Sequence, residues 1–320
     1  MLTYDPEFAA AAGPLLHQHV QQDQSPNLAA TQAKMHAMCD MVPSQPCPDE
    51  VEQLVHQAPA VDSHQITVYH YRLKRNEGSP SKTPAVVHMH GGGYVALTAQ
   101  QTATAQFTLT AHTGVPVLSI EYRRAPEHPY PTPLDDCWAA LLWIVTHADM
   151  LAIDVHRIAV MGESAGGGLA AALALLARDR GLSPPLAKQI LVYPCLDDRT
   201  RTNPVGEFAF WTEHDNVNAW TAYLGNRAGT EDVPAYAAPA RVQSVEGLPP
   251  LYLDCPQLDL FLSESCEYVR RFLEANISVE FHIYPGLPHG FEAFAPTSGP
   301  VQRACMNRFR AVASLYDEIQ

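Results

Sequence analysis

The chain has 320 residues, of which 47% are hydrophobic and 17% are charged, enough apolar material for a large core and too little charge for a disordered protein. Its 20 Lys and Arg residues stand against 34 Asp and Glu residues, a formal net charge of −14, which would repel a polyanion and argues against nucleic acid as a partner. Seven cysteines without a C-x-x-C pair fit neither a disulfide framework nor a zinc ribbon.

The N-terminal residues 1–55 are rich in Gln, His, Ala and Pro, with apolar residues at helical spacing. We expect short helices there, packed outside the main fold. No Lys or Arg precedes the first apolar residues, unlike the start of a secretory signal peptide. The longest apolar run, 169–177, is shorter than the ~20 residues that span a bilayer. We therefore expect a cytoplasmic protein without stable membrane association.

From residue 66 onwards, short β-rich runs alternate with longer helical patterns, which is typical of a mostly parallel sheet covered by helices. The fold class is therefore α/β. The predicted strands are 66–72, 85–90, 115–121, 157–162, 189–194, 250–255 and 279–284. The predicted helices are 102–112, 134–147, 165–180, 260–275 and 301–316.

One interval is longer than a single crossover needs. Roughly 55 residues separate the strand that ends at Tyr193 from the strand that begins near Pro250. Within the interval, residues 208–225 have a helical pattern with Trp and Phe side chains. We expect an insertion at 200–225 that joins the N-terminal helices of residues 1–55 in a cap over the main domain of residues 56–320. An ordinary surface excursion is the alternative.

The most informative segment is G-E-S-A-G at 162–166, which ends a predicted strand and precedes a helix rich in small residues. In this G-x-S-x-G setting, a sharp strand-to-helix turn lifts the serine hydroxyl above the sheet, and the glycines permit a strained, closely packed backbone. The helix N-terminus adds positive potential where an oxyanion would form. Ser164 is therefore the candidate nucleophile.

A serine hydroxyl is a poor nucleophile at neutral pH, so it needs a base and a group that orients the base. In this setting the chain order is Ser, then Asp or Glu, then His, each in a loop after a strand. His289 lies in a Gly- and Pro-rich loop after the last predicted strand, and Asp259 lies in the loop after the strand before it. Asp254, within that strand, and Asp197 and Asp198, after an earlier strand, are the other candidates for the acid.

A glycine run, H-G-G-G-Y at 90–94, also follows a strand directly. Consecutive glycines let backbone N–H groups converge on one point, as a tetrahedral oxyanion requires. Gly92 and Gly93, with the N–H of Ala165, are the candidate oxyanion donors.

Two other interpretations of this run are weaker. A phosphate or dinucleotide loop would need G-x-G-x-x-G or G-x-x-x-x-G-K-[ST], and neither is present. A metal site at His88 and His90 would need a further ligand cluster beside it. We expect no metal and no organic cofactor.

With these motifs the chain resembles the hormone-sensitive-lipase-like branch of the α/β-hydrolase superfamily, also called family IV bacterial esterases. The resemblance implies a mostly parallel central sheet of about eight strands flanked by helices, a helical cap, and hydrolysis of carboxylic esters, usually with short acyl chains. It also suggests that the strand at 279–284 lies at a sheet edge, where it is available for forming a homodimer. The matching segments are HGGGY (90–94), EYRRAPEHPYPTPLDDC (121–137), RIAVMGESAGGGLAAALA (157–174), LVYPCLDDRT (191–200), YAAPARVQSVEGLPPLYLD (236–254) and VEFHIYPGLPHGFE (279–292).

The chain departs from the family pattern near three of these motifs. Glu163 precedes the serine where Asp is more frequent, Pro256 stands where Gly is usual, and Arg124 replaces a usual apolar residue. None of the three changes removes a candidate catalytic group.

The function that these residues predict is that of a serine carboxylesterase, which hydrolyses a small-molecule ester through an acyl-enzyme. An amidase, a lactonase or an arylformamidase could use the same triad. A non-catalytic small-ligand receptor is a more distant alternative, because plant gibberellin receptors resemble this family but lack the catalytic histidine, which is present here as His289. The candidates for an apolar substrate pocket are Tyr94, Phe208, Phe210, Trp211 and Phe291.

Overall fold

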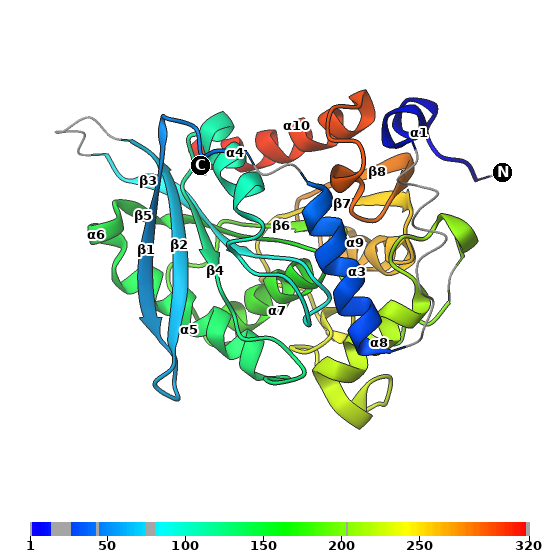
Figure 1. Ribbon diagram of the computed structural model, residues 1–320. Coiled ribbons are helices and arrows are strands. Elements are labelled where there is room, and N and C mark those ends of the chain that lie inside the picture. Colours follow the sequence, from blue (N-terminus) through cyan, green and yellow to red (C-terminus); the bar gives the residue numbers. More distant parts are fainter. Residues whose placement is uncertain (1, 14–26, 43–44, 75–80, 203, 318–320) are drawn as a thin grey trace.

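The computed structural model describes residues 2–13, 27–42, 45–74, 81–202 and 204–317. At its centre lies one eight-stranded sheet with the strand order β1-β2-β4-β3-β5-β6-β7-β8 (Figure 1). Strands β3 to β8 pair in parallel, while β2 is antiparallel to both β1 and β4. The predicted mostly parallel sheet is confirmed, and β8 lies at one edge of it. The strands are β1 (Val51–Pro59), β2 (Gln65–Leu73), β3 (Thr83–Met89), β4 (Val117–Ile120), β5 (Ile153–Glu163), β6 (Lys188–Val192), β7 (Leu251–Leu258) and β8 (Val279–Pro288).

Strand β1 differs from the sequence prediction, because residues 51–55 fall in the region expected to be helical. β1 pairs with β2 along its whole length, from Val51 opposite Leu73 to Pro59 opposite Gln65. It lies at the other edge of the sheet, and its inner residues are only partly buried. A half-exposed edge strand does not need a continuous apolar run, so its sequence, VEQLVHQAP, lacked the pattern used to find the other strands.

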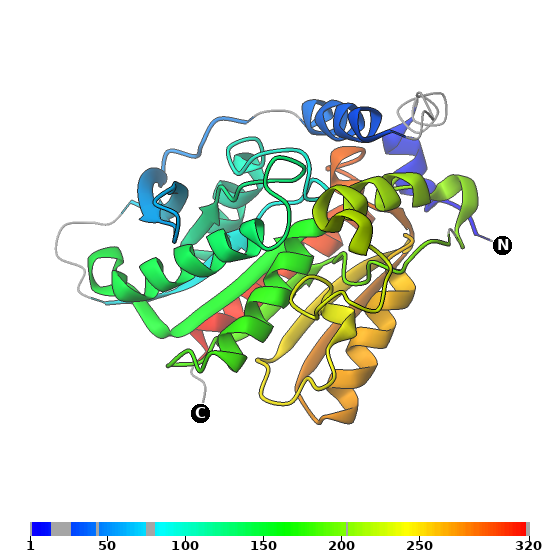
Figure 2. The same cartoon turned by 90° about the horizontal axis from the view of Figure 1, so that it is seen from below.

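Helices cover both faces of the sheet, as predicted. α4 and α10 lie on one face, and α5, α7 and α9 lie on the other, which faces the viewer in Figure 2. The helices are α1 (Pro6–Ala12), α3 (Leu28–Met41), α4 (Ala103–Thr113), α5 (Thr132–Thr146), α6 (Ala148–Leu151), α7 (Ala165–Asp179), α8 (Glu213–Leu224), α9 (Leu262–Glu274) and α10 (Gly299–Ala313). Single turns of 3₁₀ helix are η1 (Gly206–Phe208), η2 (Gly225–Arg227), η3 (Pro239–Arg241), η4 (Phe291–Ala293) and η5 (Ser314–Tyr316).

Helix α7 is the central helix of its face, and every residue from Ala165 to Ala177 is buried. Its first half is composed mainly of Gly and Ala. These small side chains allow the helix axis to lie close to the sheet, because no large side chain separates the two backbones. The N-terminus of α7 therefore comes directly against the ends of β3 and β5.

Helices α3 and α8 lie side by side over the carboxyl ends of the strands (Figures 1 and 2). A buried ion pair joins them, with Lys34 Nζ 2.6 Å from Asp215 Oδ2. The Thr31 hydroxyl donates to the other oxygen of Asp215 at 2.9 Å, and Gln32 donates to Val95 O at 3.0 Å. α3 is thus fixed both to α8 and to the loop that follows the glycine run. Residues 14–26 and 43–44 of the predicted N-terminal helices, and residue 203 of the predicted insertion, lie outside the described residues.

The segment before α3 binds the opposite end of the chain. Asp5 N–H donates to Gly286 O at 2.9 Å, and Glu7 Oε1 accepts from Gly299 N–H at 2.6 Å. Phe8 is fully buried and packs edge-on against Phe294, with ring centroids 6.5 Å apart. The N-terminal segment therefore supports the loop between β8 and α10. In the part of the chain that the structure describes, no helix has both the length and the apolar character needed to cross a bilayer.

The ion pair between α3 and α8 predicts a pH-dependent contribution to stability. Burial alone would raise the pKa of the Asp215 carboxyl, but the ion pair with Lys34 and the hydrogen bonds from Thr212 outweigh it, so the pKa lies below its ordinary value. Such a group contributes stability that is present above its ordinary pKa and is lost as the pH falls through its folded-state pKa. We expect Asp215→Asn to lower the free energy of unfolding at neutral pH by about 2–4 kcal/mol.

Urea unfolding of the wild type and of Asp215→Asn, compared from about pH 7 to about pH 3.5, measures this contribution. The difference between the two proteins should shrink below about pH 4. Asp149→Asn is the control, because its ion pair with Lys82 is exposed and its loss should have no measurable effect. A difference for Asp215→Asn that stays constant with pH would contradict the assignment.

Candidate active site

Ser164 occupies a strained turn between β5 and α7. Its φ of 55° and ψ of −119° lie outside the regions that residues with a side chain commonly adopt. Neighbouring glycines make the turn possible: a Cβ on Gly162 would lie 2.2 Å from Gly166 O, and one on Gly166 would lie 2.0 Å from Met89 O. Both glycines of G-x-S-x-G are thus required by close backbone contacts. The turn directs the serine side chain away from the helix, whose N-terminus it does not cap.

The structure brings the three predicted side chains together. Ser164 Oγ lies 2.9 Å from His289 Nε2, and His289 Nδ1 lies 2.6 Å from Asp259 Oδ2. Ser164, Asp259 and His289 are 8%, 2% and 4% exposed, respectively. Asp259 follows β7 and His289 follows β8. Both loops, like the serine turn, therefore begin at the carboxyl ends of the parallel strands. The arrangement is one in which the imidazole can accept the serine proton while the carboxylate holds its Nδ1–H.

The local backbone orients Asp259, because its second oxygen, Oδ1, accepts the N–H of Phe261 at 3.0 Å. The other acid candidates are occupied elsewhere. Asp254 is bound by Arg308. Asp197 is bound by Arg199 in the same loop, and Asp198 is bound by Arg241 of η3. The alternatives that the sequence left open therefore do not reach His289.

The glycine run lies directly beside the serine turn. A Cβ on Gly91 would come within 3.1 Å of Glu163 O. Gly92 and Gly93 have positive φ angles of 117° and 62°, and Gly92 O accepts the N–H groups of Val95 and Ala96. Among the described residues, the N–H groups of Gly92 and Gly93 have no hydrogen-bond partner, so the turn leaves both available to a ligand. Ala165 begins α7, where an N–H has no intrahelical acceptor.

His90 stabilises the start of this loop. Its imidazole stacks on the ring of Tyr122 at 4.3 Å, and Nδ1–H donates to Gly91 O at 2.7 Å. Tyr122 O–H donates to His90 O at 2.7 Å. Burial lowers the pKa of His90 to about 3, so the imidazole is neutral near pH 7 and adds no charge beside the site.

His88 ties the serine turn to the sheet. Its Nε2 lies 2.8 Å from Glu163 Oε2, and its Nδ1 lies 2.8 Å from Ser119 Oγ. Within the described ranges, no three His, Cys, Asp or Glu side chains are grouped so that they could hold a metal ion. The longer Glu163 side chain, at a position where Asp is more frequent, reaches a histidine on the neighbouring strand.

Trp211, one of the predicted pocket residues, lies beside both Gly93 and His289. Its Cη2 atom lies 2.6 Å from where a Cβ on Gly93 would be, and its ring centroid is 6.4 Å from that of His289. The indole is 2% exposed, and its N–H donates to Asn216 Oδ1 at 3.2 Å. Asn216 in turn donates to Thr200 O at 2.8 Å. Trp211 is therefore a fixed wall beside the candidate oxyanion donors.

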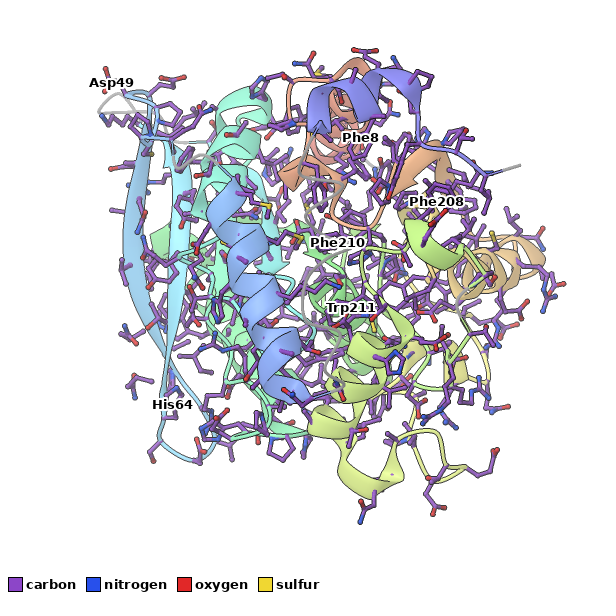
Figure 3. All side chains as sticks on the ribbon, turned by 45° about the vertical axis from the view of Figure 1, so that its right-hand side comes forward. Phe8, Asp49, His64, Phe208, Phe210 and Trp211 are labelled. Atoms are coloured by element: carbon purple, nitrogen blue, oxygen red, sulfur yellow. The ribbon has the colours of Figure 1, made fainter. Side chains whose placement is uncertain are left out.

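Phe208 and Phe210 contact aromatic rings outside the candidate triad. Phe208 packs edge-on against Tyr4 with ring centroids 5.1 Å apart, and Phe210 packs against Phe294 at 4.6 Å. Figure 3 shows Phe208 toward the N-terminal segment and Trp211 farther inside the molecule. These two phenylalanines join the insertion to the N-terminal and C-terminal parts of the chain, because their apolar rings pack against other aromatic rings there.

Tyr94 and Phe291 are buried packing residues. Tyr94 is 1% exposed and stacks on Tyr223 at 4.2 Å. Phe291 has no exposed surface, and its ring contacts Tyr193 and Tyr284. The sequence missed Tyr193, whose ring lies 4.6 Å from the imidazole of His289. Its position directly after β6, at the same edge as the other site loops, is the feature that could have identified it.

Comparisons with known proteins support the fold and the family. A family described by its α/β-hydrolase fold matches residues 86–293. Esterase LipI of Mycobacterium tuberculosis is 33% identical over 219 residues, which are 67% of this chain and 68% of LipI. Hormone-sensitive lipase of Mus musculus is 39% identical over 111 residues, 35% of this chain and 15% of the lipase. Among solved structures, a bacterial heroin esterase superposes with a TM-score of 0.87 at 34% identity, covering 98% of each chain.

The contact between Gly166 and Met89 predicts that an alanine at position 166 changes stability in the direction opposite to that expected from helix propensity. Alanine in a helix is favoured over glycine by about 1 kcal/mol, yet a Cβ on Gly166 would lie 2.0 Å from Met89 O and 2.5 Å from His90 O. We expect Gly166→Ala to destabilise the protein by about 2 kcal/mol or more and to displace the serine turn, abolishing activity. Gly181→Ala is the control: Gly181 has a φ of 67° and nothing within 4 Å, so only backbone strain of about 1 kcal/mol applies.

Thermal unfolding and ester turnover of the two variants measure this difference. A Gly166→Ala protein as stable and as active as the wild type would show that α7 can move away from the sheet.

Proposed function

The chain belongs to the hormone-sensitive-lipase-like branch of the α/β-hydrolase family and is a carboxylic ester hydrolase, and on that premise we propose that it hydrolyses short-chain esters through the triad Ser164, His289 and Asp259. The observation that carries the proposal is the pair of hydrogen bonds that links the three side chains, 2.9 Å from Ser164 Oγ to His289 Nε2 and 2.6 Å from His289 Nδ1 to Asp259 Oδ2.

In the first half of the reaction, Ser164 Oγ attacks the ester carbonyl carbon while His289 Nε2 accepts its proton. Asp259 keeps the proton of His289 on Nδ1, so that Nε2 presents a lone pair to the serine, and it stabilises the imidazolium that forms. The carbonyl oxygen becomes an oxyanion and is met by the N–H groups of Gly92, Gly93 and Ala165. His289 then gives its proton to the leaving alcohol, and an acyl-enzyme remains on Ser164.

In the second half, water takes the place of the alcohol. His289 accepts a proton from the water, whose oxygen attacks the acyl carbon, and the same N–H groups stabilise the second oxyanion. Return of the proton from His289 to Ser164 Oγ releases the carboxylic acid and restores the starting state. Each transferred proton passes through His289 Nε2, so the reaction rate depends strongly on the position of that atom.

The preference for short acyl groups follows from what covers the site. The helices α3 and α8, with the segment that contains Trp211, act as a cap built from the N-terminal helices and the insertion. The indole of Trp211 closes the space beside Gly93 and is fixed through Asn216. A long acyl chain would need to displace a buried ring that is hydrogen-bonded to the cap, which costs binding energy in the transition state.

Replacement of the nucleophile tests the triad. We expect Ser164→Ala to lower kcat for p-nitrophenyl butyrate by about 1,000-fold or more, because the acyl-enzyme can no longer form. Ser298→Ala is a matched control, since Ser298 is also buried but its hydroxyl donates to Ala295 O, away from the triad. Substantial turnover by a folded Ser164→Ala protein would overturn the proposal. Matched ester and amide substrates, tested on the wild type, separate an esterase from an amidase on the same triad.

Replacement of Trp211 tests the cap assignment. We expect Trp211→Ala to raise the ratio of kcat/KM for p-nitrophenyl octanoate to that for the butyrate by about tenfold, because the acyl chain gains the volume of the indole. Trp138→Ala is the control, because Trp138 lies on α5 beneath Arg180, and Arg180 lies at the opposite end of α7 from Ser164. An unchanged ratio in Trp211→Ala would mean that the bound acyl chain lies against another wall of the site.

A further inference from the structure

A second set of side chains surrounds the imidazole of His289 without belonging to the triad. The first is Tyr193, the residue that follows β6. It has a positive φ of 34° and is 6% exposed. Its ring is tilted by 59° against the imidazole at a centroid distance of 4.6 Å. An apolar face at this distance restricts the directions in which the imidazole can rotate.

The hydroxyl of Tyr193 is bound to the same loop that carries His289. It donates to Glu292 Oε2 at 3.0 Å, and Glu292 lies only three residues after His289. The ring of Tyr193 therefore contacts the imidazole, while its hydroxyl contacts the Glu292 side chain in the loop that carries His289. These two contacts together define the position of His289 relative to β6.

Glu292 is fixed in turn by Arg308 from α10. Arg308 Nη1 donates to Glu292 Oε1, and its Nε and Nη2 bind the two oxygens of Asp254 at 2.7 and 2.9 Å. Asp254 is fully buried within β7. The guanidinium also lies 5.4 Å from the ring of Tyr193. A buried arginine held by two carboxylates has little freedom to move, because any displacement would leave a buried charge unpaired.

We propose that Tyr193, Glu292 and Arg308 are positioning residues, which hold His289 Nε2 at the distance from Ser164 Oγ that proton transfer requires. The inference rests on the proposed function, since it concerns the base of the proposed triad. Asp259 binds Nδ1 of the imidazole, and the rings of Phe261 and Trp211 lie beside it at centroid distances of 5.3 and 6.4 Å. The chain of contacts from β7 through Arg308 and Glu292 to Tyr193 restrains the imidazole on the side of β6. Its loss should lower kcat and leave KM unchanged, because substrate binding does not use it.

A double-mutant cycle on Tyr193→Phe and Glu292→Ala tests the inference with p-nitrophenyl butyrate. We expect each single variant to lower kcat by about fivefold, with KM within about twofold of the wild type. The double variant should be no slower than the slower single one, because both changes remove the same hydrogen bond. Glu292→Gln should recover part of the lost rate, since an amide oxygen can still accept from Tyr193.

Tyr252→Phe is the matched control. The Tyr252 hydroxyl donates to Asp254 Oδ2 at 3.0 Å, so this variant also removes a buried hydrogen bond from a tyrosine to a carboxylate. It leaves the contacts of Arg308 with Asp254 and Glu292 in place. Tyr252 has no contact with His289 among its ring and hydrogen-bond partners in the described chain. We expect a melting temperature lowered as much as in Tyr193→Phe, with kcat unchanged.

The results of these experiments distinguish the positioning role of Tyr193, Glu292 and Arg308 from the proposed esterase function. If Ser164→Ala is inactive while Tyr193→Phe and both Glu292 variants keep the wild-type kcat, the inference is wrong and the proposed function stands. If the effects on kcat add in the double variant, or if Tyr252→Phe loses the same activity, the residues act through general stability and the inference is also wrong. If Tyr193→Phe does not fold, the comparison of Glu292→Ala with Glu292→Gln decides. Activity retained by Ser164→Ala would instead overturn the proposed function itself.

Discussion

The close approach of the first turn of α7 to the ends of β3 and β5 is the constraint on which the rest of the site depends. Gly166 lies against the carbonyl of Met89, and Gly91 lies against the carbonyl of Glu163. These two contacts bring the serine turn and the glycine run together without any side chain between them. The candidate oxyanion donors and the candidate nucleophile are therefore part of one rigid backbone arrangement, which is what a preorganised electrostatic site requires.

The positions of the candidate catalytic residues could be predicted because parallel strands end at the same edge of a sheet. Ser164, Asp259 and His289 each follow a strand with a clear apolar pattern, and the structure places them within hydrogen-bonding distance. The roles of the aromatic residues could not be predicted in the same way. Phe208 and Trp211 have similar hydrophobicity and lie three residues apart, yet one packs on Tyr4 and the other on Gly93. That difference depends on how the insertion folds over the sheet, which a residue type does not encode. β1 escaped prediction for a related reason, since an edge strand needs only one partner and a partly buried face.

Buried carboxylates connect the loops around the site, although the chain as a whole is strongly acidic. Glu264, near the start of α9, accepts the N–H of Leu196 at 2.6 Å and the hydroxyl of Thr200. Thr200 is also the residue whose carbonyl holds Asn216, the partner of Trp211. The helix that follows Asp259 is thus linked by hydrogen bonds to the wall of the proposed acyl pocket. Both oxygens of the buried Glu264 carboxylate accept hydrogen bonds, as buried polar groups generally do.

The helices that cover the site, α3 and α8, are far apart in the chain, and this affects the order in which they fold during synthesis. Lys34 and Asp215 are separated by 181 positions in the chain, and Asp5 binds Gly286 near the other end. At about 5–20 residues per second, α3 leaves the exit tunnel many seconds before α8 exists. The apolar side chains of Phe8 and Met35 cannot be buried until the residues that pack against them have been synthesised. α1 and α3 are therefore made long before these partners and reach their final positions only after the partners have been made.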